Sequence, residues 1–131
     1  MNFFVMPTGS QVNGPPVRVS DGHCQTEAYA LGFGSDFRWR AYMTGSEADG
    51  EAGQVARDRI GSGPWYNYYG VMIAEDLEQL HSDQSYLDQT TAVTLTGDFV
   101  APDRLAVPRG SALDASRFSR EGPYFCFGIP G

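Results

Sequence analysis

Glycine and proline set the strongest limit on what this chain can fold into. The sequence holds 16 Gly and 8 Pro among 131 residues. Both residue types break regular structure, so this content excludes long uninterrupted helices and favours a fold rich in turns and loops. At this length, 41% apolar and 13% aromatic residues are enough for one hydrophobic core. We therefore expect a single domain, residues 1–131.

The excess of acidic over basic residues limits which classes of molecule the chain can bind. Nine basic residues, all of them arginine, stand against 16 acidic residues and give a formal net charge of −7. This balance disfavours a nucleic-acid-binding surface, because phosphate contacts require a basic stripe. The apolar runs are far shorter than the roughly 20 residues of a membrane span. We therefore expect a soluble domain that binds no nucleic acid and does not insert into a membrane.

The two cysteines, Cys24 and Cys126, lie 102 positions apart and form no Cys-x-x-Cys pair. Two interpretations stay open. A disulfide would stabilise the fold by roughly 4 to 5 kcal/mol in the loop-entropy model, and it would indicate an oxidising compartment. Alternatively, both are reduced thiols that act as small core residues. The residues after Met1 resemble a strand and not a secretory leader, so export would need a leader removed beforehand or another route.

The first part of the chain predicts a strand followed by a helix. Residues 2–6 are apolar and end at turn-forming residues, which indicates a strand. Ser20 or Asp21 can cap a helix that ends before Gly32. The apolar face of this helix holds Cys24, Ala28 and Leu31.

Further elements follow from periodicity. Residues 37–43 alternate as a half-buried strand, with Trp39 facing inward and Tyr42 outward. Residues 54–60 form a helical turn or a strand, and residues 75–81 a short helix with Leu77 and Leu80 facing inward. Three more strands are expected, at residues 71–74, 90–96 and 124–129. No internal repeat occurs, so the pattern as a whole predicts an α+β domain.

Several segments carry a family resemblance. They are residues 37–44, residues 56–67 with the run Arg-Ile-Gly-Ser-Gly-Pro-Trp-Tyr-Asn, residues 70–81, and the shorter stretches 21–25 and 91–97. Together they resemble bacterial endostatin-like domains of the C-type-lectin-like fold, over about residues 20 to 97. The resemblance implies small antiparallel sheets, two helices, long loops, and a first-helix cysteine that points toward the last strand.

The same resemblance implies a function. It indicates an extracellular or cell-surface domain, exported by a bacterium or by an organism that lives with one, with a ligand-binding and not a catalytic role. The ligand would be a glycan or a protein. An alternative from another class is a structural subunit of a surface layer, a fibre or a larger multi-protein assembly. A monomer would favour ligand binding, whereas an obligate oligomer would favour the structural role.

The aromatic run after the glycines has two interpretations. Trp65, Tyr66 and Asn67 can bind a ligand, because stacking rings beside an amide suit a sugar. Alternatively, Trp65 fills the core and Asn67 holds a loop, which is favoured because the run is the signature of the family it resembles. The expected structural signature comprises Trp39, Arg57, Asp58, Arg59, Trp65 and Asn67. In it, residues 57–59 form an internal brace of ion pairs and hydrogen bonds.

The loops at residues 44–53 and 97–122 are the other expected ligand surfaces. The second loop contains Arg104, Arg109, Arg117 and Arg120. If these side chains gather on one face, they form a basic patch for an anionic partner such as a sulfated glycan. The alternative is that they pair with neighbouring carboxylates. Arg104, Arg117 and Arg120 are the ligand-binding candidates in this segment.

Neither a metal, nor a cofactor, nor catalysis is expected. The paired motifs of a calcium-dependent sugar site are missing, and Ala101-Pro102-Asp103 lacks the required amide or acid before the proline. His23 and Cys24 are adjacent on one helix and point about 100° apart, so they do not converge on a zinc ion. The sequence contains no Gly-x-Ser-x-Gly, Ser-x-x-Lys or His-Glu-x-x-His motif. An enzyme would need His23 or His81 in a pocket beside an acid with a shifted pKa.

Overall fold

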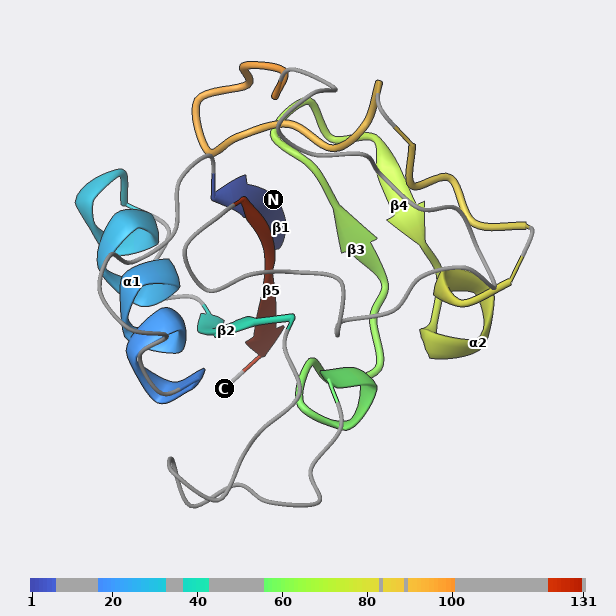
Figure 1. The fold of residues 1–131 in the computed structure, drawn as a ribbon. Coiled ribbons are helices and arrows are strands. Elements are labelled where there is room, and N and C mark those ends of the chain that lie inside the picture. The colour runs from blue at the N-terminus through green and yellow to red at the C-terminus, as the bar shows by residue number, and fades with distance from the viewer. Residues whose placement is uncertain are drawn as a thin grey trace.

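The computed structural model describes residues 1–6, 17–32, 37–42, 56–82, 84–88, 90–100 and 123–130 (Figure 1). The helices and strands follow in the order β1 (Phe3–Met6), α1 (Val17–Ala30), β2 (Phe37–Ala41), a 3₁₀ turn (Ala56–Asp58), β3 (Trp65–Tyr66), β4 (Met72–Ala74), α2 (Leu77–Leu80) and β5 (Tyr124–Pro130). The last strand, β5, runs between β1 and β2 and is antiparallel to both. Strands β3 and β4 form a separate antiparallel pair. The α+β class, the two helices and the antiparallel sheets are thereby confirmed.

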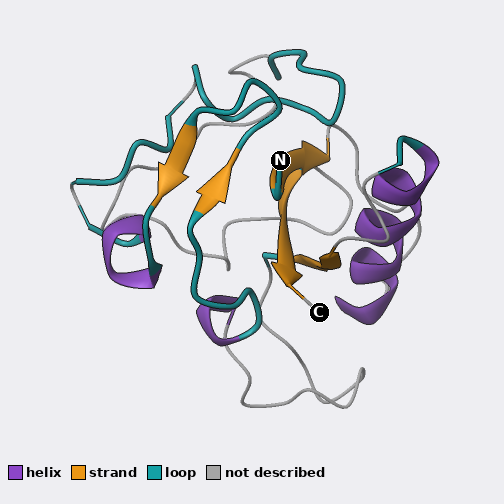
Figure 2. Ribbon diagram, turned by 180° about the vertical axis from the view of Figure 1, so that it is seen from behind, coloured by secondary structure: helices purple, strands orange, loops and turns teal. Residues whose placement is uncertain are grey.

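The three-stranded sheet lies between two layers. Helix α1 covers one face, while β3, β4 and α2 lie on the other side (Figures 1 and 2). Adjacent residues of a strand point to opposite faces, so β1 sends Phe3 into one core and Phe4 into the other. β5 does the same with Phe127 and Cys126. Because both faces are covered, β1 and β5 are apolar throughout and show no polar alternation.

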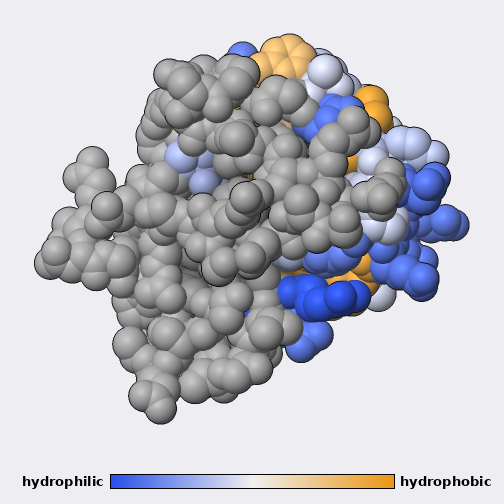
Figure 3. Space-filling model, turned by 45° about the vertical axis from the view of Figure 1, so that its right-hand side comes forward, coloured by the Kyte–Doolittle hydropathy of each residue, from blue (hydrophilic) through white to orange (hydrophobic). Residues whose placement is uncertain are grey.

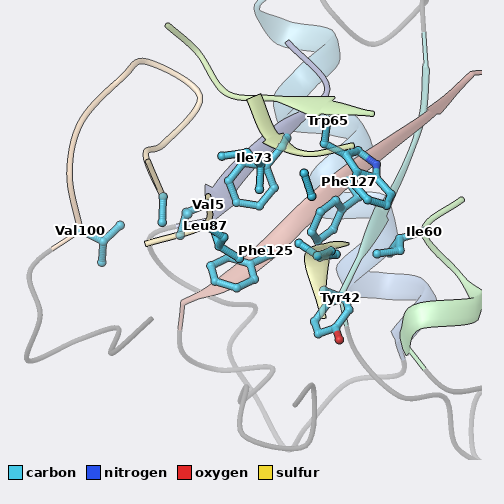
Figure 4. Packing of buried hydrophobic residues seen from close by; sticks show 13 residues of the cluster. Val5, Tyr42, Ile60, Trp65, Ile73, Leu87, Val100, Phe125 and Phe127 are labelled. Carbon is cyan, nitrogen blue, oxygen red and sulfur yellow. The ribbon is translucent and has the colours of Figure 1, made fainter. Parts of the chain in front are cut away.

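The larger core lies between the sheet and the β3–β4 side of the molecule (Figure 4). Phe127 is at its centre, with ring centroids 5.0 Å from Phe3, 5.3 Å from Trp65 and 5.7 Å from Tyr42. Tilted and edge-on aromatic pairs of this kind add about 0.5–1.5 kcal/mol each beyond the burial of their area. Leu80 of α2 is fully buried and Leu77 packs against this core, as the sequence predicts.

The smaller core lies between the sheet and α1. It contains Ala28, Trp39 and the disulfide Cys24–Cys126, whose Cα atoms are 5.9 Å apart. The disulfide interpretation of the two cysteines is therefore confirmed, and it links the N-terminal helix to the C-terminal strand. Burial raises the pKa of Tyr124 in the same core to about 12, so this hydroxyl keeps its proton at physiological pH.

Helix α1 and strand β2 differ from the prediction at their ends. The helix begins at Val17, so Asp21 lies inside it and does not cap it. The Asp21 carboxylate instead accepts hydrogen bonds from Ala41 and Arg59. Leu31 comes after the helix end and is 49% exposed, although a buried position was expected. Tyr42 was expected to face solvent but is buried, because it lies on the opposite face of the sheet from Trp39 and Ala41, and the larger core covers that face too.

Smaller differences concern the middle of the chain. Residues 90–96 form no strand; Thr94 and Val93 make only isolated bridges, to Val5 and Phe99. The expected helix over residues 75–81 is shorter, because Asp76 caps it and accepts a 2.8 Å hydrogen bond from the backbone N–H of Gln79. Residues 56–58 adopt the expected helical turn, as a single 3₁₀ turn. Within the described residues, no helix is both long and apolar enough to cross a membrane.

Candidate functional site

The run Arg-Ile-Gly-Ser-Gly-Pro-Trp-Tyr-Asn forms a scaffold. Ile60 and Trp65 are buried in the larger core. Gly63 has φ +84°, and a Cβ there would lie 3.0 Å from the Glu75 carbonyl oxygen and 3.1 Å from the Trp65 ring. Only glycine combines this backbone conformation with such close packing. The turn therefore fixes where β3 begins and how Trp65 enters the core.

The guanidinium of Arg59 connects this scaffold to α1 and β2. Its Nη1 donates a 2.7 Å hydrogen bond to the carbonyl oxygen of Ala41, and its Nη2 forms an ion pair with Asp21. The Arg59 side chain is fully buried, and that of Asp21 is 18% exposed. A buried cation requires such partners, since removal from water costs several kcal/mol. The brace predicted at residues 57–59 is thus formed by Arg59 with Asp21, while Arg57 and Asp58 are exposed.

Asn67 organises the tight loop between β3 and β4. Its Oδ1 accepts hydrogen bonds from the backbone N–H groups of Tyr69 at 2.9 Å and Val71 at 3.0 Å. Its Nδ2 donates to the carbonyl oxygen of Thr91 at 3.1 Å. The residue is 1% exposed. One buried amide therefore fixes the loop and ties it to the segment around residue 91.

The loop presents two tyrosines at the surface. The Tyr68 and Tyr69 rings meet edge-on with centroids 5.1 Å apart, and Tyr69 is 60% exposed. The Tyr69 hydroxyl donates a 2.6 Å hydrogen bond to the carbonyl oxygen of Gly97. A Cβ at Gly97 would lie 2.6 Å from the Tyr68 ring, and the glycine has φ +87°. Both rings are thus seated on the Gly97 turn and held in a fixed arrangement.

An open hollow of about 390 Å³ adjoins the same loop at Val71. It is lined by Val71, Met72, Ser85, Tyr86, Asp88 and Thr91. Tyr86 is 52% exposed there, while its backbone N–H donates a 3.0 Å hydrogen bond to Ile73 of β4. We call Tyr68, Tyr69, Val71 and Tyr86 the tyrosine face. Figure 3 shows the surface on the β4 and α2 side, where hydrophilic side chains gather around separate apolar ones.

A second polar pair lies at the edge of the larger core. His81 follows α2, and its Nδ1 lies 2.8 Å from the carbonyl oxygen of Leu77, so Nδ1 carries a proton. Its Nε2 then accepts a 2.6 Å hydrogen bond from the Tyr42 hydroxyl. Burial lowers the pKa of His81, the Leu77 carbonyl opposes this shift, and the Arg57 cation lowers the pKa further. The pair therefore favours a neutral imidazole.

The predicted ligand residues separate into three groups. Trp65 and Asn67 are each 1% exposed, so they support the site from beneath and their side chains do not reach a ligand; this corrects the alternative in which they contact it. Tyr66 is partly exposed on β3. Arg104, Arg117 and Arg120 lie outside the described residues, as does the loop at residues 44–53.

Sequence reasoning missed Val71, Tyr86 and Asp88 as neighbours in one hollow. No periodicity marks residues 84–88, and their place depends on the Tyr86–Ile73 backbone hydrogen bond. Among the described residues, no group of three or more His, Cys, Asp or Glu side chains could hold a metal ion. His81 has Tyr42 beside it, and neither it nor His23 lines the hollow.

Comparisons with known proteins give no relative: no family model, no curated protein and no solved structure matches this chain.

Proposed function

We propose that this chain is a non-enzymatic, extracellular or surface-displayed binding domain, which holds a glycan or a protein ligand on its tyrosine face. The observation that carries the proposal is the fixed arrangement of exposed tyrosines beside an open hollow. Exposed apolar groups rimmed by polar ones are typical of binding surfaces. Tyrosine suits this role because it offers a large contact area with few rotatable bonds and a polar hydroxyl.

The proposed class is a C-type-lectin-like, endostatin-like domain. Two features support it besides the sequence resemblance: the strands near both ends of the chain pair side by side, and a disulfide joins the first helix to the last strand. The disulfide is also consistent with an oxidising compartment, as expected outside the cell. In such a fold, rigid elements position the loops that carry function.

A structural subunit of a larger assembly is the alternative. A separate patch favours it: Tyr29 is 68% exposed on α1, beside a second hollow of about 450 Å³ lined by α1 residues. Helix α1 and the β3–β4 pair lie on opposite sides of the three-stranded sheet (Figure 2). Two different patches on opposite sides would permit head-to-tail association of identical copies.

The first experiment measures the molar mass of the oxidised protein in solution by size-exclusion chromatography with light scattering. We expect a monomer across the accessible concentration range. A ring, a filament or an obligate oligomer that dissociates in a Tyr29→Ala variant would replace the binding proposal with the structural one.

The second experiment screens the protein on a glycan array and on a panel of purified extracellular proteins, and measures each hit by biolayer interferometry. A Tyr68→Ala, Tyr86→Ala double variant should weaken binding by about ten-fold or more, since central aromatic contacts dominate binding energy. The matched control is Tyr29→Ala, an exposed tyrosine on α1, and it should bind like the wild type. Equal losses in both variants would place the ligand elsewhere.

A further inference from the structure

The net charge of the chain is concentrated in one segment. Between Arg59 and Arg104 the sequence contains no arginine or lysine. The acidic residues in this interval are Glu75, Asp76, Glu78, Asp83, Asp88, Asp98 and Asp103. These seven charges equal the net charge of −7 for the whole chain, so the remaining residues balance to zero. The segment that carries the tyrosine face is therefore the acidic part of a molecule that is otherwise neutral.

Two of these acidic residues adjoin groups that form or support the tyrosine face. Asp88 lines the hollow together with Tyr86 and Val71. Asp98 directly follows Gly97, on which Tyr68 and Tyr69 are seated. An apolar surface between acidic groups attracts cations by two routes, through the carboxylates and through the electron-rich faces of the rings. Carboxylates in such a place disfavour sulfated and phosphorylated ligands.

Local hydrogen bonds hold both carboxylates in place. Asp88 Oδ1 accepts 2.8 Å and 3.1 Å hydrogen bonds from the backbone N–H groups of Thr90 and Thr91. Asp98 Oδ2 accepts a 3.0 Å hydrogen bond from the Thr96 hydroxyl, and its backbone N–H donates to Thr94 Oγ1 at 3.1 Å. Fixed charges lose little conformational entropy when a partner binds, so they favour a defined contact.

We propose that the occupant of the tyrosine face is an arginine-bearing segment of another polypeptide, whose guanidinium groups stack on the tyrosines and pair with Asp88 and Asp98. This inference rests on the proposed binding function and names its ligand class. A neutral glycan could stack on the rings but would gain nothing from the surrounding acidic charge. Arginine is favoured over lysine because its planar group both stacks on aromatic rings and binds carboxylates in a bidentate manner.

The probe is fluorescein-labelled hexa-arginine, compared by fluorescence anisotropy with hexa-lysine and with hexa-citrulline, a neutral isostere of arginine. We expect hexa-arginine to bind the oxidised full-length chain more tightly than hexa-lysine by about three-fold. Hexa-citrulline should bind at least about ten-fold more weakly than hexa-arginine. The affinity for hexa-arginine should fall as sodium chloride rises from about 20 mM to about 200 mM, because salt screens exposed charges.

Charge-neutral variants locate the contact. Asp88→Asn and Asp98→Asn keep an oxygen that can accept the local hydrogen bonds, and each should weaken hexa-arginine binding by about three-fold. The matched control is Glu27→Gln, which removes the same charge from an exposed position on α1 and should leave binding unchanged. A Tyr86→Leu variant should weaken binding by about three-fold through loss of the ring face. Unchanged melting temperatures would show that the variants are folded.

The outcomes separate this inference from the proposed function. Equal binding of hexa-arginine and hexa-citrulline, or an equal loss in Glu27→Gln and Asp88→Asn, would overturn the arginine contact. If hexa-arginine fails to bind but a glycan or a protein from the screen binds in a Tyr68- and Tyr86-dependent manner, the inference is wrong and the binding function stands. If no probe and no screened ligand binds, both are wrong.

Discussion

Arg59 shows how one residue can hold three parts of the molecule together. It is the only fully buried charged side chain among the described residues, and its guanidinium reaches Asp21 on α1 and the Ala41 carbonyl on β2. The same Asp21 carboxylate accepts a 2.7 Å hydrogen bond from the backbone N–H of Ala41. Arg59 and Asp21 thus link three parts of the chain that are far apart in sequence.

Replacing Asp21 with alanine should destabilise the fold by about 3–5 kcal/mol, because it removes the negative charge of Asp21 from beside the buried Arg59 cation. The measurement is urea unfolding followed by tryptophan fluorescence. The control is the Asp21→Ala, Arg59→Met double variant, in which no charge remains buried, and it should be more stable than Asp21→Ala alone. A double variant that is less stable than the single one would contradict the role assigned to the pair.

His81 should make stability depend on pH. Its pKa in the folded protein is lowered from 6.5, chiefly by burial, so the unfolded chain takes up a proton more readily. The stability that neutral His81 contributes is therefore complete above pH 6.5 and is lost as the pH falls through the lower folded value. The advantage of the wild type over His81→Gln in unfolding free energy should shrink between about pH 7.5 and about pH 5. A constant difference over this range would show that His81 titrates alike in both states.

At the scale of elements, the turn at Gly97 positions the β3–β4 loop that carries Tyr68 and Tyr69. Replacing Gly97 with alanine should cost about 1–3 kcal/mol, because the residue has φ +87° and its Cβ would lie 2.6 Å from Tyr68 and 2.8 Å from the Tyr69 hydroxyl. The displaced rings should also change the near-ultraviolet circular dichroism. Gly22→Ala is the matched control: Gly22 lies within α1 with no atom near its virtual Cβ, so alanine should add stability of about 1 kcal/mol. Equal effects of the two substitutions would contradict the proposed packing.

Elements that depend on local signals could be predicted from the sequence. Apolar runs bounded by turn residues located β1 and β5, and Asp76 with Leu77 and Leu80 located α2. The start of α1 could not be found this way, because Asp21 is a typical capping residue by type but lies inside the helix, where its carboxylate accepts hydrogen bonds from Arg59 and Ala41. Residues 90–96 alternate like a strand, but Gly97 turns the chain back and Thr94 bonds with Asp98.

The candidate site, too, could be predicted from the sequence only in part. The sequence located the aromatic run at residues 65–67, and it also favoured structural roles for Trp65 and Asn67, which are buried. It could not indicate that Tyr86 and Asp88 share a hollow with Val71, because non-local hydrogen bonds bring together the segments that carry them. Tyr86 bonds to Ile73 of β4, and Asn67 reaches the carbonyl oxygen of Thr91.

For the whole molecule, the fold depends on the pairing of its first strand with its last strand. β1 and β5 lie side by side in one sheet, and Asn2 extends that sheet toward the β3–β4 pair. The Asn2 Oδ1 accepts a 2.6 Å hydrogen bond from the backbone N–H of Tyr66, and its Nδ2 donates to the Pro64 carbonyl oxygen at 2.8 Å. The tyrosine face is therefore supported by strands whose pairing requires the last residues of the chain to return to the first.

The disulfide Cys24–Cys126 lowers the entropy that the chain loses on folding when β5 pairs with β1. It closes a loop with a sequence separation of 102 residues, and confining the unfolded chain to such a loop should contribute about 4–5 kcal/mol to stability. For a small domain with a total stability of about 5–15 kcal/mol, reduction removes a large share. Urea unfolding of the oxidised protein, of the protein in dithiothreitol and of a Cys24→Ala, Cys126→Ala variant should give one high and two similar low free energies. If the alanine variant matched the oxidised protein, the packing of the two cores alone would hold the ends together.

Intact-mass analysis after alkylation without reductant provides the chemical check. Two alkylated thiols in the folded protein would remove the loop closure and with it the argument for an oxidising compartment.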